Sequence, residues 1–324
     1  RGQTGTAASW PTVRKAAASA GYADEPTQAV RSYVALLRNL SAGQSAVVTK
    51  EAMNLKKKAL AKKQYGAALS GFDVYASLQG RSAMPLVTKA TGNASRVYRV
   101  GVLEIASGFM QAGDYKALAE QAKKLTGVEQ KEDIIALIGN SGDASLVSLV
   151  KPYIGNANDG LNIAGMNAAA LLGGEGVAVE LVNQMKKAGA SQKVVDVAKE
   201  ALMTYKGNVD DIVGVAAAQG TEAGRVAALE ILARRGAASK ADLVLSLTGD
   251  NNDKVAAQAY RTLPCVATAE QLPKLYQLLN TTAQTNVPMV QNAVIAALKG
   301  QSANAASQSV RYNMGTSSGN ADRY

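Results

Sequence analysis

The sequence predicts an all-α protein, an α-α superhelix built as a solenoid of stacked antiparallel helix pairs. A short segment that ends an apolar stretch recurs every 29 to 35 residues. Its equivalent positions are Ala106, Ile138, Leu172, Met203, Leu232, Leu263 and Leu298. Hydrophobic residues make up 47% of the chain and aromatic residues only 5%, so the core must be aliphatic. No run alternates Val, Thr, Tyr and Phe as a sheet would. A period of this length indicates helix pairs that cover one another's apolar faces.

Residues 1–83 are predicted to form an atypical, basic, helical N-terminal cap. A short helix is expected over residues 12–20, after Trp10 and Pro11. Pro26 is expected in the first turn of a helix that runs to Leu40, since proline favours that position. Thr49 is expected to cap the lysine-rich helix that follows. The spacing fits the repeat poorly here, as is typical of a terminal repeat.

Residues 84–300 are predicted to form the repeat array. Glycine and asparagine stand between the apolar stretches, where they favour helix ends and caps, and Asp253 is a predicted N-cap. Residues 301–324 are rich in Ser, Asn, Gln, Gly and Ala, and we expect a flexible linker or tail that leads to a further domain. The predicted helix pairs are 84–91 with 95–110, 115–125 with 132–138, 145–153 with 161–172, 177–187 with 192–205, 210–218 with 223–234, 240–247 with 253–263, and 270–279 with 288–298.

Two of the second helices resemble HEAT or armadillo-type repeats. Their sequences are Arg225-Val226-Ala227-Ala228-Leu229-Glu230-Ile231-Leu232 and Asp253-Lys254-Val255-Ala256-Ala257-Gln258-Ala259-Tyr260-Arg261-Thr262-Leu263. A tetratricopeptide array would instead show Trp, Tyr and Gly at set positions of a 34-residue period, and these landmarks are not regular here. More loosely, the chain is similar to HEAT regions of exported bacterial proteins that can accompany a carbohydrate-active domain. The resemblance implies a scaffold or adaptor.

The net charge of +10 is concentrated in the N-terminal part of the chain. Residues 1–130 hold 18 Lys and Arg against 8 Asp and Glu, whereas residues 131–324 hold 17 of each. The densest run is Lys56, Lys57, Lys58, Lys62 and Lys63. It can form a solvated outer face, a docking surface for an acidic partner or, less readily, a nucleic-acid surface, because aromatic residues for base stacking and a recognisable nucleic-acid motif are both missing.

The sequence offers few groups for catalysis. It contains no histidine, so the commonest general base and metal ligand is missing. We expect Cys265 to be a buried or half-buried structural thiol. The neighbouring carboxylates Asp210 and Asp211 stand at a predicted helix start, where negative charge is favoured. We therefore expect no catalytic residue, no cofactor and no metal in this segment, and the lack of an 18-residue apolar run predicts no membrane span.

The predicted function is a non-catalytic scaffold that binds a protein or peptide along its concave helical face. The partner can be acidic, and we expect a monomer and favour a periplasmic or exported location over the cytoplasm. One alternative is an accessory region of a larger exported enzyme whose catalytic domain lies beyond residue 324. Nucleic-acid binding through residues 1–100 is the other. The predicted contact residues on the second helices are Arg96, Arg99, Asn167, Lys199, Arg225, Gln258, Arg261 and Gln291.

Overall fold

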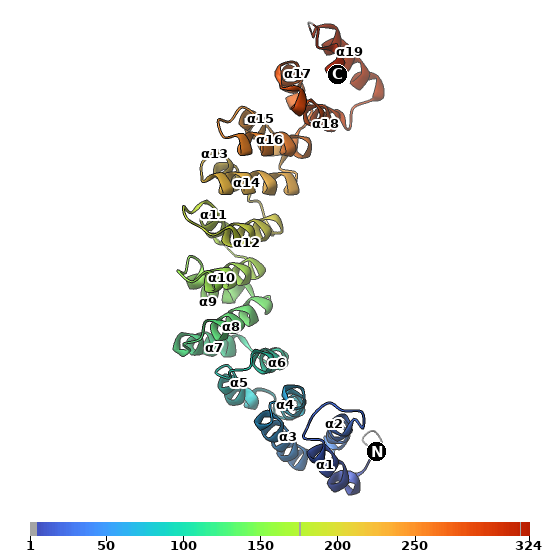
Figure 1. Cartoon of the computed structure of the whole chain (residues 1–324), viewed down its shortest axis with the longest axis vertical. Helices are drawn as coiled ribbons and strands as arrows, with labels where there is room; N and C mark the ends of the chain where they lie inside the picture. The colour runs from blue at the N-terminus through green and yellow to red at the C-terminus, as the bar shows by residue number, and fades with distance from the viewer. Residues whose placement is uncertain (1–4, 175, 318) are drawn as a thin grey trace. The chain divides into compact units, whose positions relative to one another are not determined.

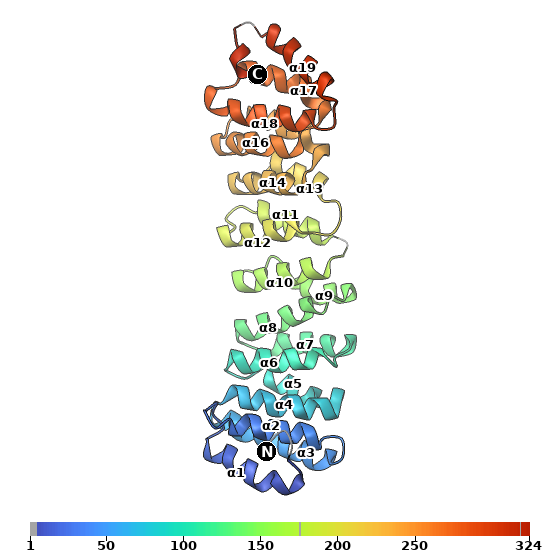
Figure 2. The same cartoon turned by 90° about the vertical axis from the view of Figure 1, so that its right-hand side faces the viewer.

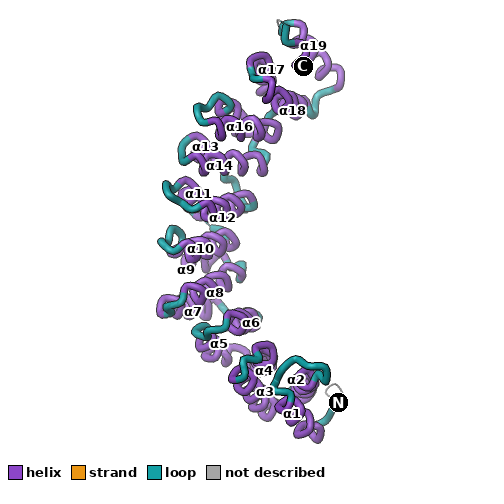
Figure 3. The backbone as a smooth tube through the Cα atoms, in the orientation of Figure 1, coloured by secondary structure: helices purple, strands orange, loops and turns teal. Residues whose placement is uncertain are grey.

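The computed structural model describes residues 5–174, 176–317 and 319–324. Across these residues it contains α-helices, 3₁₀ turns and loops but no strand (Figure 3), which confirms the predicted all-α class. The chain divides into two compact units, Arg1–Val150 and Lys151–Tyr324. This division falls inside the predicted 84–300 array. No helix in the described part of the chain is both long enough and apolar enough to cross a membrane.

The first unit consists of helix pairs that stack in chain order (Figure 1). Within it, α4, α6 and α8 contact one another in succession, and α3, α5 and α7 each contact the helix that follows. The predicted N-terminal cap lies in this unit, although residues 1–4 of that prediction lie outside the described residues. The helices of the first unit are α1 (Trp10–Ser19), α2 (Ala29–Leu40), α3 (Ser45–Ala61), α4 (Tyr65–Gln79), α5 (Met84–Ala90), α6 (Arg96–Ser107), α7 (Ala112–Lys124), α8 (Val128–Asn140) and α9 (Val147–Val150).

The second unit repeats this arrangement, with its even-numbered helices forming successive layers (Figure 2). From α10 to α18, each even-numbered helix contacts the next, so the second helices of the pairs form a continuous layer. The helices of this unit are α10 (Asp159–Leu172), α11 (Val177–Lys186), α12 (Gln192–Met203), α13 (Asp210–Ala218), α14 (Glu222–Arg235), α15 (Ala241–Leu247), α16 (Asp253–Val266), α17 (Leu272–Thr281), α18 (Val287–Leu298) and α19 (Ala303–Gly315).

Aliphatic side chains fill the space between successive helices. Leu202, Leu229, Leu232 and Leu263 are all at least 99% buried, and they come from three neighbouring second helices. Small residues set how closely the helices approach. A Cβ atom at Gly71 of α4 would lie 2.7 Å from the backbone nitrogen of Lys56 and 2.8 Å from the carbonyl oxygen of Ala52, both on α3. Glycine is therefore required where α4 crosses α3.

Three residues that are predicted to begin or cap a helix have other positions in the structure. Pro26 precedes the helix, since α2 begins at Ala29 after Gln28 in a left-handed conformation. The carboxylate of Glu25 accepts the N–H groups of Thr27 and Ala29, and these hydrogen bonds together with the Thr27 hydroxyl lower its pKa. Helix α3 begins at Ser45, which leaves Thr49 inside it. The N-cap of α16 is Asn252, whose side chain accepts the N–H groups of Lys254 and Val255, and the predicted cap Asp253 is the first helical residue.

Residues 301–324, which are predicted to be a flexible linker or tail, contain α19 and a turn after it, and residue 318 lies outside the described residues. The Ser302 side chain caps α19, and the hydroxyls of Ser309 and Tyr276 lie 2.9 Å apart. The Arg323 guanidinium donates to the carbonyls of Leu279 and Thr282, at 3.1 and 2.8 Å. Carbonyls at the end of a helix lack partners within the helix, so Arg323 satisfies groups that α17 leaves open.

We expect the Gly71→Ala variant to lower the free energy of unfolding of the first unit. Overpacking against the α3 backbone costs about 1–3 kcal/mol, more than the ~1 kcal/mol or less that alanine gains over glycine in a helix. Trp10 is the sole tryptophan and lies in α1, so its fluorescence during urea titration reports on this unit.

Gly66→Ala is the matched control for this change. Gly66 lies in the same helix, and a Cβ atom there would have no neighbour within 4 Å. We expect this control to leave stability unchanged or raise it by less than ~1 kcal/mol. Equal effects of the two substitutions would contradict the close approach of α3 and α4.

Candidate functional site

Two of the eight predicted contact residues are buried, so their prediction as surface contacts is corrected. Arg99 of α6 is 2% exposed and Gln258 of α16 is 9% exposed. Arg99 stands one helical turn before the buried Val102 and Leu103, on the apolar face of its own helix. That spacing is the signal in the sequence that would have placed Arg99 inside the protein.

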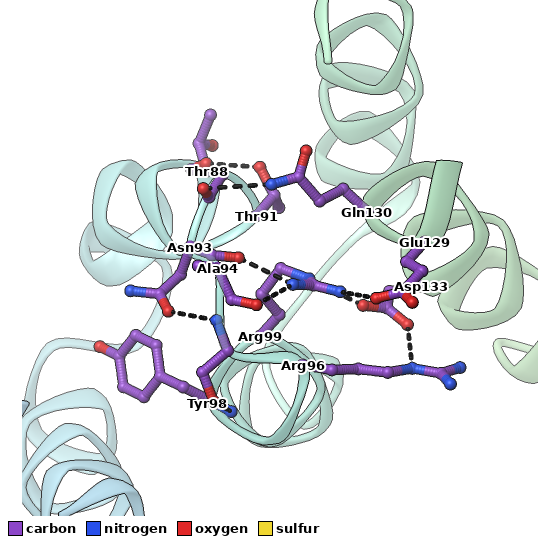
Figure 4. Close-up of polar contacts among 12 residues, drawn as sticks. Thr88, Thr91, Asn93, Ala94, Arg96, Tyr98, Arg99, Glu129, Gln130 and Asp133 are labelled. Atoms are coloured by element: carbon purple, nitrogen blue, oxygen red, sulfur yellow. Dashed lines mark hydrogen bonds and ion pairs between the residues drawn. The ribbon is translucent and has the colours of Figure 1, made fainter. Parts of the chain in front are cut away.

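Arg99 forms a buried ion pair with Asp133 of α8 (Figure 4). Its Nε donates to Asp133 at 2.9 Å, and the two side chains are 2% and 1% exposed. Its Nη1 donates to the carbonyls of Asn93 and Ala94, at 2.8 and 3.1 Å. A single guanidinium thus joins α8 to the turn that precedes α6.

The predicted contact residue Arg96 supports the same carboxylate from the surface. Its Nε donates to Asp133 at 3.0 Å, while 63% of its side chain stays exposed. The Nη2 of Arg99 lies 3.7 Å from the carboxylate of Glu129, which is beyond hydrogen-bond distance. Because buried charges are costly unless they are paired, this cluster is a structural link between α6 and α8.

Arg225 is also occupied within the chain. Its guanidinium binds the carboxylate of Asp250, and its Nε donates to the carbonyl of Ala217 at 2.9 Å. These contacts join α14 to the last turn of α13 and to the turn after α15. The hydrogen bond from Arg225 lowers the pKa of the Asp250 carboxyl. Both side chains are 16% exposed, so little of Arg225 is available to a partner.

The remaining predicted residues lie wholly or partly at the surface. Asn167 and Arg261 are exposed. Gln291 is half-buried and its amide donates to the carbonyl of Arg323 at 3.0 Å. The ammonium of Lys199 lies 2.8 Å from Glu230 of the next second helix, and this contact raises the pKa of Lys199.

We use the name ridge for five side chains of the second unit: Asn167, Lys199, Glu230, Arg261 and Ile295. Each lies on a successive second helix, α10 to α18, and none of the five is buried. The ion pair between Lys199 and Glu230 links two neighbouring positions directly. Glu230 and Ile295 are absent from the predicted set, although each lies about one repeat from a predicted neighbour. The ridge has mixed polar and apolar character and lies on helices that pack against one another.

The structure separates the five predicted surface lysines. Lys56, Lys57 and Lys58 lie in the last turns of α3, whereas Lys62 and Lys63 follow its end. Cations at this end of a helix interact favourably with its dipole. Lys56 is half-buried and the other four are exposed. Burial lowers the pKa of Lys56, and repulsion from Lys89 of α5 adds to the shift.

Groups that could carry other chemistry are dispersed. In the part of the chain that the structure describes, no three His, Cys, Asp or Glu side chains gather as a metal site. Asp210 and Asp211 diverge, the first toward Arg235 and the second toward Lys240. Cys265 is exposed, which corrects the prediction of a buried or half-buried thiol. It lies one turn after Arg261, on the outward face of α16.

We expect Asp133→Ala to lower the free energy of unfolding of the first unit by about 3–5 kcal/mol, since it leaves a buried guanidinium without its carboxylate. Arg96→Ala removes only the exposed partner and should cost less than ~1 kcal/mol. The measurement is urea unfolding followed by Trp10 fluorescence. If the two variants were equally stable, Arg99 and Asp133 would not form a buried pair.

Comparison with known proteins assigns no family. No family model matches the sequence, and no curated protein matches it. One similar solved structure is human deoxyhypusine hydroxylase in complex with glycerol, at 13% sequence identity and a TM-score of 0.33, over 78% of this chain and 98% of that chain. A sequence identity and a TM-score this low indicate nothing about activity.

Proposed function

We propose that this chain is a non-catalytic interaction scaffold, and that a protein or peptide partner binds along the ridge of the second unit. The observation that carries the proposal is the exposure of large apolar side chains on or beside the ridge. Leu171 is 63% exposed one turn after Asn167, and Ile295 is 59% exposed on α18. Partners of scaffolds bind to apolar anchors within a polar rim.

The polar residues of the ridge suit such a rim. Arg261 is exposed and makes no ion pair with a described residue, so its guanidinium can bind a carboxylate or carbonyl of a partner. Lys199 and Glu230 stay partly exposed, at 20% and 34% of their side chains. Because α10 to α18 hold these groups on packed helices, binding requires little ordering of the surface.

The placement of the carboxylates also supports a scaffold. General acid–base catalysis requires a titratable group that faces a substrate. Here Asp133, Asp210 and Asp250 each face an arginine of the same unit. Paired in this way, they stabilise helix contacts. The histidine-free sequence provides no imidazole to take their place.

We predict that the double variant Arg261→Glu and Ile295→Glu weakens partner binding by about tenfold or more, because both changes fall on the ridge. The measurement is affinity capture from the native source with quantitative mass spectrometry. A photo-crosslinker on Cys265, the single thiol of the chain, identifies which captured proteins contact the ridge.

The matched control is Val179→Glu with Lys187→Glu, one apolar and one basic exposed residue from α11 and its end. Circular dichroism checks that both double variants keep their helicity. The control should retain the crosslinked partners. Retention of the same partners by the ridge variant would contradict the proposal.

A further inference from the structure

A groove in the first unit combines apolar walls with positive charge. Lys56 and Lys57 of α3 and Lys89 of α5 line it, together with Leu60, Leu86 and Tyr98, and its volume is about 680 Å³. None of the described residues that line it is acidic. We call it the lysine groove. Lys89, Leu86 and Tyr98 lie outside the basic run of the sequence, and stacking of α3, α5 and α6 brings them beside it.

The charges of the lysine groove are uncompensated. None of its three lysines makes an ion pair with a described residue, whereas every arginine between residues 5 and 150 does. Lys56 is half-buried, and both burial and Lys89 disfavour its charged form. A bound anion would relieve the repulsion between Lys56 and Lys89.

The Arg99 guanidinium of the buried ion pair also holds a residue that lines the groove. Asn93 lines the groove, and its carbonyl accepts a hydrogen bond from Arg99 at 2.8 Å. Its side-chain oxygen accepts the N–H of Ser95 at 2.9 Å. Figure 4 shows Tyr98 pointing away from the guanidinium of Arg99, so one turn of α6 supplies both a wall of the groove and its support. A groove fixed in this way is ready for a ligand.

We propose that the lysine groove binds an acidic peptide segment that carries one large apolar residue. Carboxylates of the segment would pair with Lys56, Lys57 and Lys89, and the apolar side chain would lie against Leu60 and Leu86. The α3 residues that line the groove run from Met53 to Ala61. This is about 12 Å of helix at ~1.5 Å per residue, the length of about four extended residues.

The groove fits a peptide better than a nucleic acid or a membrane. Among the described residues that line the groove, Tyr98 is the sole aromatic one, and it is 2% exposed, so it offers no face for base stacking. The concave shape admits a single chain, while a flat lipid surface would reach only the rim. This site lies in a different unit from the ridge and does not depend on it.

The test is fluorescence anisotropy of the full chain with a fluorescein-labelled peptide that has two aspartates on each side of a leucine. We expect Lys57→Glu with Lys89→Glu to weaken binding about tenfold or more at ~0.15 M salt, where the Debye length is about 8 Å. Both lysines are exposed, so the fold should not change. The matched control, Lys58→Glu with Lys62→Glu, alters two exposed lysines of the same run that do not line the groove.

The control variant should keep affinity within about threefold of the unmodified chain. A peptide with glycine in place of leucine should bind more weakly, since it lacks the apolar contact. Equal losses in the two double variants would overturn the proposal, because charge alone would then explain binding. So would no binding of the peptide by the unmodified chain, or preferred binding of a single-stranded oligonucleotide or of anionic vesicles. Ridge variants should bind this peptide normally, which separates the two sites.

Discussion

Each helix pair can cover its apolar face only by stacking on the next pair, and this constraint determines most of what the structure contains. Stacking places a side chain beside the residue about one repeat further along the chain. Arg81 with Asp114, Arg99 with Asp133, and Lys199 with Glu230 are ion pairs of this kind, separated by 33, 34 and 31 positions. The same period therefore sets the aliphatic core and the charge pairs that accompany it.

The arginines of the first unit differ from the lysines of the groove in their pairing. Its described arginines all bind carboxylates, whereas the lysines around the groove bind none among the described residues. The planar guanidinium of arginine can hold several acceptors at once, as Arg99 does with Asp133 and two carbonyls. Lysine keeps a compact, hydrated charge on a flexible stem. The net positive charge that remains for a partner is consequently carried by lysine.

Much of the fold could be predicted from the sequence, because the repeat period and the residues that cap or end helices can be recognised in it. The starts of α5 and α13 and the end of α10 were predicted to the residue. The spacing of Arg99 from Val102 and Leu103 indicates its buried face, but its partner Asp133 lies 34 positions away, and no local pattern identifies that partner. The exposure of Cys265 depends on which face of α16 the neighbouring helices cover, and this is decided by packing. Helix α19 is stabilised by contacts with α17, such as that between Ser309 and Tyr276, and the composition of residues 301–324 does not reveal these contacts.

The candidate surfaces were predicted in part. Asn167 and Arg261 are exposed second-helix residues, as expected, while Arg225 and Gln258 are held by the packing of their own unit. The lysine run was evident, but its significance depends on Lys89 and Tyr98, which only the stacked helices bring to it. Local sequence thus indicates which residues are basic, and packing decides which of them are left unpaired.

Amine labelling of individual lysines, quantified by mass spectrometry at neutral pH, tests most directly which lysines packing leaves paired and which it leaves unpaired. Lys254 is 74% exposed, yet its contact with Glu222 raises its pKa, whereas burial and Lys89 lower the pKa of the half-buried Lys56. A lower pKa gives more of the reactive neutral amine at a given pH. We predict that Lys56 reacts faster than Lys254 despite its lower exposure. Faster labelling of Lys254, in order of exposure alone, would contradict it.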